Sequence, residues 1–375
     1  YVLCAGKGDS GVKYAVYRLM QALETKGLTV GVPPLRLDAN PFFKGRLACL
    51  GAAMSSGAPA LIQKHYAWEN WQLSRITALA DFFDACGMNG IMSSDNPARY
   101  DWTGNHITPE QFVAKQHALA RETHLNGMTF CMMMLGTSSL EARSLSELQP
   151  RDPKQRKLIL DFYDDMFRKY GDITDLLWTQ WADPGGAPAP ADISDPQKLH
   201  LEMIKRLEAK RGKPVEQVFS AHGLHWPLGP GGSLPWAGYT GPESLTGGGI
   251  LPKGICIGLP EMVIEEGGMA FARKVKAAGY RVGIFGWLMP DYEMNPGIHV
   301  HTQMMDNYFH RLPAEAKDLF DWYEDGLVYT TMSPASFYVF SRMMWDPQSS
   351  ADQHLADFCQ AAFGPELGPK MLKGY

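Results

Sequence analysis

The chain has 375 residues, of which 45% are hydrophobic and 20% are charged. This balance excludes intrinsic disorder, and the length suits either two average domains or one large α/β barrel. A formal net charge of −5 without long runs of like charge argues against nucleic acid or a membrane surface as partner. No apolar run reaches the roughly 18 residues that a membrane-spanning helix needs.

The first 46 residues read as a separate piece. A strand is expected over 1–5, a helix over 12–26 and a Pro-rich linker up to Pro41. The chain opens in this strand-like run, which suggests that a further segment precedes it. The Gly-rich stretch at 6–11 matches neither the phosphate-binding loop nor the dinucleotide-binding spacing.

From there on, short apolar runs alternate with helical patterns. The runs are apolar on both faces, as strands of a parallel sheet are. They cover residues 47–54, 90–95, 128–135, 175–183, 217–222, 254–261, 281–289 and 327–332.

Helices are expected between the runs. The pattern predicts them over 71–86, 109–126, 153–170, 196–211, 267–278 and 337–345. Thr108 with Pro109 and Gln111 has the sequence of an N-terminal capping box, and Gly127 is a natural C-terminal stop. No helix is expected between 222 and 253, which is rich in Gly and Pro.

Eight such β/α units predict a (β/α)₈ TIM barrel over residues 47–345. Residues 1–46 would be the end of a small α/β domain with its linker. Residues 346–375, with a helix over 351–363, would open a C-terminal helical region.

Catalytic groups of such a barrel come from the C-terminal ends of its strands. Carboxylates follow three of them: Asp183 after the fourth run, Glu261 after the sixth, and Asp291 and Glu293 after the seventh. Glycoside hydrolysis needs two carboxyl groups flanking the scissile bond, one of them held protonated. Structural roles stay open: Asp183 as a turn residue, Glu261 at a helix start, and the other two in a solvated loop.

Other side chains at these strand ends suit a sugar ligand. The 10 Trp, 15 Tyr and 17 Phe include several Trp beside Gly, Pro, Asp or His, and such rings stack on sugars. The candidates for substrate binding are Trp181, His222, His225, Trp226, Trp287, Tyr292, His299, His301, Asp95, Arg99 and Lys64. Arg99 and Lys64 would meet a uronate.

Metal and cofactor signals are weak. His299 and His301 form an H-x-H pair, which in metal-dependent hydrolases follows the first strand, whereas here it follows the seventh. A hydrogen bond to substrate is the favoured role. The six cysteines are scattered without C-x-x-C spacing and are expected to pack as small hydrophobes. No metal and no cofactor is predicted.

Several segments resemble bacterial α-glucuronidases and β-N-acetylhexosaminidases, in which a small α/β domain precedes the barrel. Residues 8–19 (GDSGVKYAVYRL) are similar to the strand-turn-helix that closes that domain, and 41–46 (PFFKGR) to the entry into the barrel. Residues 81–90 are similar to a helix-to-strand step, and 344–347 with 363–364 to the start of a C-terminal helical region.

The resemblance implies a glycosidase, with Glu261 and Asp291 or Glu293 as the acid/base pair. The family's Glu after the fourth strand is absent beside Asp183. Asp183 would bind substrate or supply the acid.

The sequence thus predicts a glycoside hydrolase that acts on a poly- or oligosaccharide, such as one containing uronate or N-acetylhexosamine. A polysaccharide lyase, a metal-dependent hydrolase and a barrel that only binds glycan remain alternatives. The oligomeric state stays open, and a periplasmic or secreted location would suit a bacterial enzyme of this kind.

Overall fold

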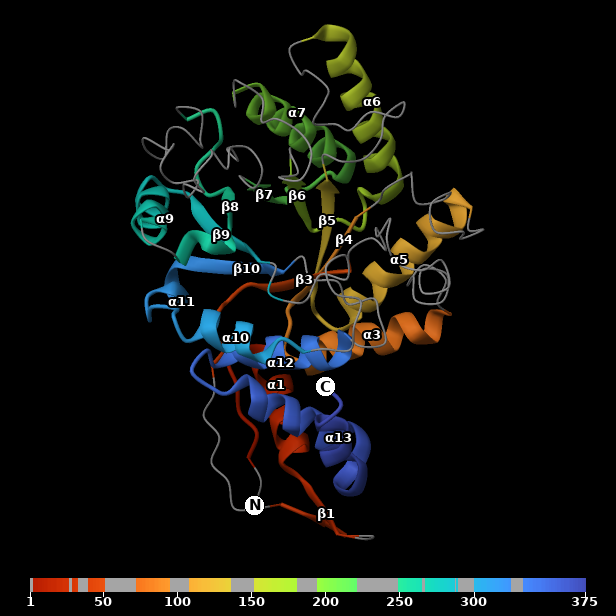
Figure 1. The fold of residues 1–375 in the computed structure, drawn as a ribbon. Helices are drawn as coiled ribbons and strands as arrows, with labels where there is room; N and C mark the ends of the chain where they lie inside the picture. Colours follow the sequence, from red (N-terminus) through yellow and green to blue (C-terminus); the bar gives the residue numbers. More distant parts are fainter. Residues whose placement is uncertain are drawn as a thin grey trace.

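The computed structural model describes residues 3–26, 29–32, 40–50, 72–94, 108–135, 152–180, 194–220, 249–264, 267–286, 288, 300–324 and 333–375. Within these residues, eight strands close into a parallel barrel in which each strand pairs with the next along the chain (Figure 1). The last strand, β10, pairs with the first, β3, and completes the ring. The barrel that the sequence predicts is therefore confirmed.

The barrel strands are short and almost wholly buried. They are β3 (Arg46–Leu50), β4 (Gly90–Ser94), β5 (Thr129–Leu135), β6 (Leu176–Gln180), β7 (Glu216–Ser220), β8 (Cys256–Pro260), β9 (Arg281–Gly286) and β10 (Phe320–Glu324). Seven of them lie at the predicted runs. The eighth prediction was wrong, because the closing strand is Phe320–Glu324 and not 327–332, which lies outside the described residues.

Helices surround this barrel. They are α3 (Leu73–Ala85), α5 (Pro109–Leu125), α6 (Pro153–Tyr170), α7 (Ser194–Arg211), α9 (Gly268–Ala277), α10 (Thr302–Phe309), α11 (Ala316–Leu319), α12 (Ser333–Trp345) and α13 (Ala351–Leu372). The expected capping box is present: Thr108 accepts from the Gln111 amide, and the Gln111 side chain accepts from the Thr108 amide. Gly127 follows α5 with a φ of 68°, the left-handed conformation that glycine adopts most easily.

The N-terminal segment differs from the prediction. The helix α1 spans Gly8–Ala22 rather than 12–26, and residues 3–5 form no strand. Beyond α1 the chain turns into an antiparallel hairpin, β1 (Glu24–Lys26) and β2 (Thr29–Gly31). Thr25 pairs with Val30 in this hairpin, and β-branched residues of this kind favour extended backbone over helix.

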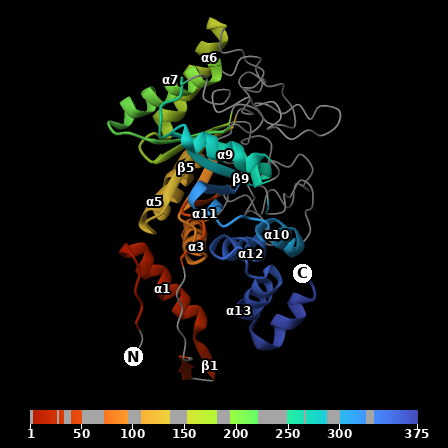
Figure 2. The same ribbon diagram turned by 90° about the vertical axis from the view of Figure 1, so that its left-hand side faces the viewer.

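Polar contacts join α1 to the barrel. Asp84 of α3 is fully buried, forms an ion pair with Lys13 at 2.5 Å and accepts a hydrogen bond from Tyr17 at 2.9 Å. The Tyr14 hydroxyl donates to the carbonyl of Met88. Both ribbon views place α1, β1 and α13 at the same end of the barrel (Figures 1 and 2). The domain boundaries at residues 46 and 345 stay predictions.

The interior of the barrel is filled by large side chains. Trp178 lies 5.0 Å from Phe285 and 4.9 Å from Tyr323 between ring centroids, and all three are buried. Gly283 leaves room for them, since a Cβ there would lie 2.6 Å from the Tyr323 ring. The barrel is thus a packed core and not a channel.

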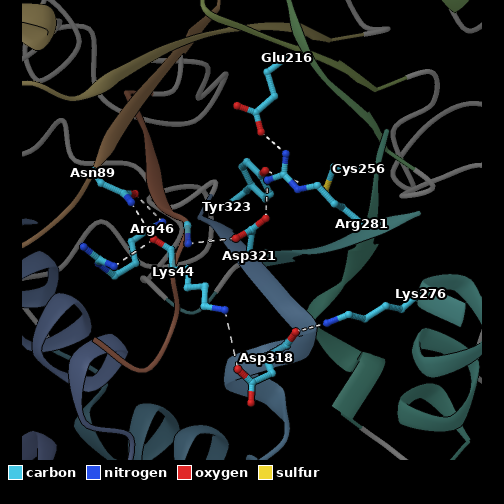
Figure 3. A network of polar contacts seen from close by, with 11 residues as sticks. Lys44, Arg46, Asn89, Glu216, Cys256, Lys276, Arg281, Asp318, Asp321 and Tyr323 are labelled. Atoms are coloured by element: carbon cyan, nitrogen blue, oxygen red, sulfur yellow. Dashed lines mark hydrogen bonds and ion pairs between the residues drawn. The ribbon is translucent and has the colours of Figure 1, made fainter. Parts of the chain in front are cut away.

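The N-terminal mouth of the barrel carries a charged network (Figure 3). Arg281 forms ion pairs with Glu216 and with Asp321, and Asp321 also accepts from the Gly45 amide at 3.0 Å. The neighbouring Arg46 donates to main-chain carbonyls, including that of Gly87 at 2.7 Å. These contacts tie the starts of the strands together, as a stabilising face of a barrel does.

The tail continues as helix. The predicted stretch 351–363 is the first part of α13, which kinks at Gly364, where φ is 75°, before Pro365. Among the residues with described placement, no helix has both the length and the apolar character to cross a bilayer. Of the cysteines, all but Cys4 are buried, as expected of small hydrophobes.

Candidate functional site

Glu261 lies where a barrel carries its chemistry. It is the first residue of the short helix η4 (Glu261–Ile264), directly after the C-terminal end of β8. Burial raises the pKa of the Glu261 carboxyl, although a hydrogen bond from its own backbone opposes this shift. A carboxyl whose protonated form is favoured is suited to act as a general acid.

The backbone of Glu261 is held from α10. The Tyr308 hydroxyl donates to the Glu261 carbonyl at 2.8 Å. The Tyr308 ring meets the Trp322 ring of β10 edge-on, with centroids 5.6 Å apart. Trp322 of β10 therefore packs against Tyr308 of α10, and Tyr308 in turn holds the first residue of η4.

A second carboxylate, Glu324, ends β10 and is fully buried. Its Oε1 accepts from the backbone amide of Leu288 at 2.7 Å, and its Oε2 accepts from the Trp322 indole Nε1 at 2.9 Å. Trp178 and Tyr323 fill the barrel interior, so Trp322 and Glu324, one residue to either side of Tyr323, point outward. Glu324 is thus not a group of the barrel mouth.

Glu324 is not among the residues predicted from the sequence, because the eighth strand was expected at 327–332 and lies at Phe320–Glu324. A usable signal was present in the run FDWYE, in which Phe320, Trp322 and Glu324 alternate with Asp321 and Tyr323. Trp322 and Glu324, two residues apart, share one face of a strand. The carboxylate at the end of such a run indicates a buried acceptor.

A pocket of about 680 Å³ opens beside α10. Its lining combines apolar and hydrogen-bonding groups: Leu288, Val300, His301, Thr302, Gln303, Met304, Asn307, Tyr308 and Arg311. His301, a predicted substrate-binding residue, is the N-cap residue of α10, and it makes no side-chain cap hydrogen bond. Tyr308 connects the pocket to Glu261, so the two described candidates border the same helix.

The remaining candidates lie outside the described residues. They are Asp183, Asp291, Glu293, Trp181, His222, His225, Trp226, Trp287, Tyr292, His299, Asp95, Arg99 and Lys64. Their roles stay predictions. No group of three metal-ligating side chains occurs in the part of the chain that the structure describes, which contains His301 but not His299.

A buried histidine lies behind β6, the strand that precedes Asp183 in sequence. His200 of α7 is buried, and its Nδ1 lies 2.7 Å from the Thr179 hydroxyl. Burial lowers the pKa of His200 to about 4, so the ring is neutral at physiological pH. We assign it to packing of α7 on the barrel.

The closed parallel barrel with its surrounding helices defines a (β/α)₈ TIM barrel, the class of protein whose sites gather at the C-terminal strand ends. No protein-family model and no curated protein matches the sequence. Solved structures do match, and all three of the following are glycoside hydrolases.

One is a glycoside hydrolase family 20 β-N-acetylglucosaminidase, at 13% identity and a TM-score of 0.57, covering 96% of this chain and 83% of that one. Another is a variant of the Thermobaculum terrenum O-GlcNAc hydrolase, at 13% identity and 0.56, covering 88% and 66%. A third is a family 138 enzyme that targets the pectin rhamnogalacturonan II, at 11% and 0.58, covering 97% and 46%. At sequence identities this low, these matches establish a shared fold and nothing finer.

Proposed function

We propose that this protein is a glycoside hydrolase that acts on a poly- or oligosaccharide. The observation that carries the proposal is Glu261, a carboxyl at the C-terminal end of a barrel strand whose pKa is raised by burial. The similarity of the barrel to three glycoside hydrolases supports the same class of reaction.

In the proposed mechanism, Glu261 protonates the oxygen of the glycosidic bond as the leaving group departs. The partner carboxylate, Asp291 or Glu293, follows β9 in sequence. It acts as nucleophile or as the base that activates water. β8 and β9 are paired neighbours, with Pro260 opposite Phe285. Glu261 follows Pro260 and Gly286 follows Phe285, so the ends of β8 and β9 lie side by side. This supports the proposal that the segments after these two strands contribute to one site.

The nature of the substrate is part of the proposal. Two of the similar structures are named for N-acetylglucosamine substrates and the third for a pectin. We propose Asp183 as a substrate ligand or alternative acid and the aromatic residues after the strands as stacking platforms. Lys64 and Arg99 are the proposed partners of a uronate.

The test is a screen against aryl glycosides, including N-acetylglucosaminides, and uronate-containing polysaccharides, with products followed by mass and ultraviolet absorbance. We expect a saturated product and a loss of turnover in Glu261→Gln. An unsaturated product would indicate a lyase, and loss of activity on chelation would indicate a metal-dependent hydrolase. Glycan binding without turnover would refute the proposed enzymatic activity.

A further inference from the structure

We infer that Glu324 is a positioning residue that fixes how the chain leaves β9 next to Glu261. This inference rests on the proposed function for its catalytic consequence, but the contact itself stands on the geometry of the described residues. Glu324 connects to Leu288 beyond β9 and, through Trp322 and Tyr308, to Glu261 after β8.

The first link is the contact between Glu324 and Leu288. Leu288 is the second residue beyond β9 and is itself buried, with 4% of its surface exposed. Its amide donates to Oε1 of Glu324 at 2.7 Å. A buried main-chain amide outside a regular strand needs an acceptor, and here a side chain from the next strand supplies it. The Leu288 amide, three residues before Asp291 in sequence, is thereby held in place.

The second link is the close approach of the Glu324 side chain to β9. A Cβ at Gly286 would lie 2.5 Å from Glu324 Oε2 and 2.6 Å from Trp322 Cζ2. Only a residue without a side chain leaves this space for both groups. The end of β9 and the Glu324 carboxylate are therefore packed against each other as well as hydrogen-bonded through Leu288.

The third link is the Trp322 ring, which holds the other carboxylate oxygen. The indole is fully buried and packs against Phe43, Phe309 and Phe340, with centroids 5.1, 5.6 and 5.9 Å away. A ring so enclosed has little freedom to turn, so its Nε1 hydrogen bond fixes Glu324 Oε2.

The same ring extends the connection to β8. Tyr308 meets Trp322 edge-on and donates its hydroxyl proton to the Glu261 carbonyl at 2.8 Å. The ends of β8, β9 and β10 are thus joined on the outside of the barrel by one set of side chains. The distance between two catalytic carboxyls decides the course of glycoside hydrolysis, and a misplacement of about 1 Å can slow a reaction on the order of a hundredfold.

The test depends on the two oxygens of Glu324, each of which accepts a hydrogen bond. In Glu324→Gln only one terminal oxygen remains, so the carboxamide NH₂ must face either the Leu288 amide or the Trp322 indole, both of which are donors. Trp322→Phe removes one of these donors. In the double variant the glutamine oxygen can accept from Leu288 while its NH₂ points at an aromatic ring.

We expect Glu324→Gln to lower kcat at least tenfold with little change in KM, and to speed hydrogen exchange of the Leu288 amide. The double variant should recover most of both losses. Arg281→Met, at the opposite mouth, is the control for loss of stability alone, and its kcat should stay at the wild-type value.

A wild-type kcat in Glu324→Gln would overturn the positioning role. A double variant whose kcat is no higher than that of Glu324→Gln would overturn it as well. If the wild-type protein turned over no glycoside, the proposed function would fail separately. Hydrogen exchange of the Leu288 amide would then still test whether Glu324 holds this amide. An unchanged exchange rate in Glu324→Gln would show that it does not.

Discussion

Replacing Glu261 with glutamine keeps the size of the side chain and removes the proton that the proposed acid donates. A positioned general acid contributes roughly 10² to 10⁴ in rate. At about 1.4 kcal/mol for each factor of ten, the variant should lose about 3 to 6 kcal/mol of transition-state stabilisation. The loss should appear in kcat/KM and should be smallest for aryl leaving groups that depart without protonation.

The pH dependence gives a second readout of the same substitution. Burial raises the pKa of Glu261 above the ordinary 4.5, so the folded protein binds this proton more tightly than the unfolded chain does. The resulting stability is fully present below the unfolded pKa and is lost as the pH rises through the folded pKa. Glutamine cannot ionise, so Glu261→Gln should gain stability relative to wild type as the pH rises above the ordinary glutamate pKa of 4.5.

The assay pairs denaturant unfolding at several pH values with the pH profile of kcat/KM. In the wild-type profile, the basic limb should lie above the range of an exposed glutamate, because the acid must stay protonated. Near-wild-type activity in Glu261→Gln would remove this residue from the mechanism. A stability difference that does not grow with pH would contradict the effect of burial.

Three further predictions concern the framework. Gly286→Ala should destabilise the protein by about 1 to 3 kcal/mol, because its Cβ has no space, and thermal unfolding measures this. Arg281→Met should lower the free energy of unfolding by only about 1 kcal/mol, because the Arg281 side chain is 43% exposed and its ion pairs with Glu216 and Asp321 are weakened by water. A larger loss in urea unfolding would contradict this. In the native protein only Cys4 should react quickly with a thiol reagent, and the buried thiols should react after denaturation.

Sequence alone predicted most of the framework because the barrel strands are apolar on both faces. β8 and β9 are buried over nearly their whole lengths, and such runs stand out from the flanking Gly and polar residues. Capping chemistry fixed the start of α5 at Thr108, since the signal there is local. Local signals of this kind do not depend on the rest of the fold.

The closing strand could not be found in the same way. β10 contains Asp321 and Glu324, whose charges hide its pattern. Both have partners far away in the sequence: Asp321 contacts Gly45 and Arg281, and Glu324 contacts Leu288. The polar residues of this strand make sense only once the barrel is closed. Contacts 36 residues apart, as between Leu288 and Glu324, leave no trace in local periodicity.

The two mouths of the barrel treat charge in opposite ways. At the N-terminal mouth, Arg281 pairs with Glu216 and Asp321 in partly exposed ion pairs that cost little to form. Near the other end, Glu324 is fully buried and Glu261 is partly buried. Glu324 is held by the neutral donors Leu288 and Trp322. Removing a carboxyl from water opposes folding, so packing alone would favour an apolar residue at either position. In the proposed mechanism this cost has a purpose: the raised pKa of Glu261 suits a general acid, and Glu324 holds the Leu288 amide beyond the neighbouring strand.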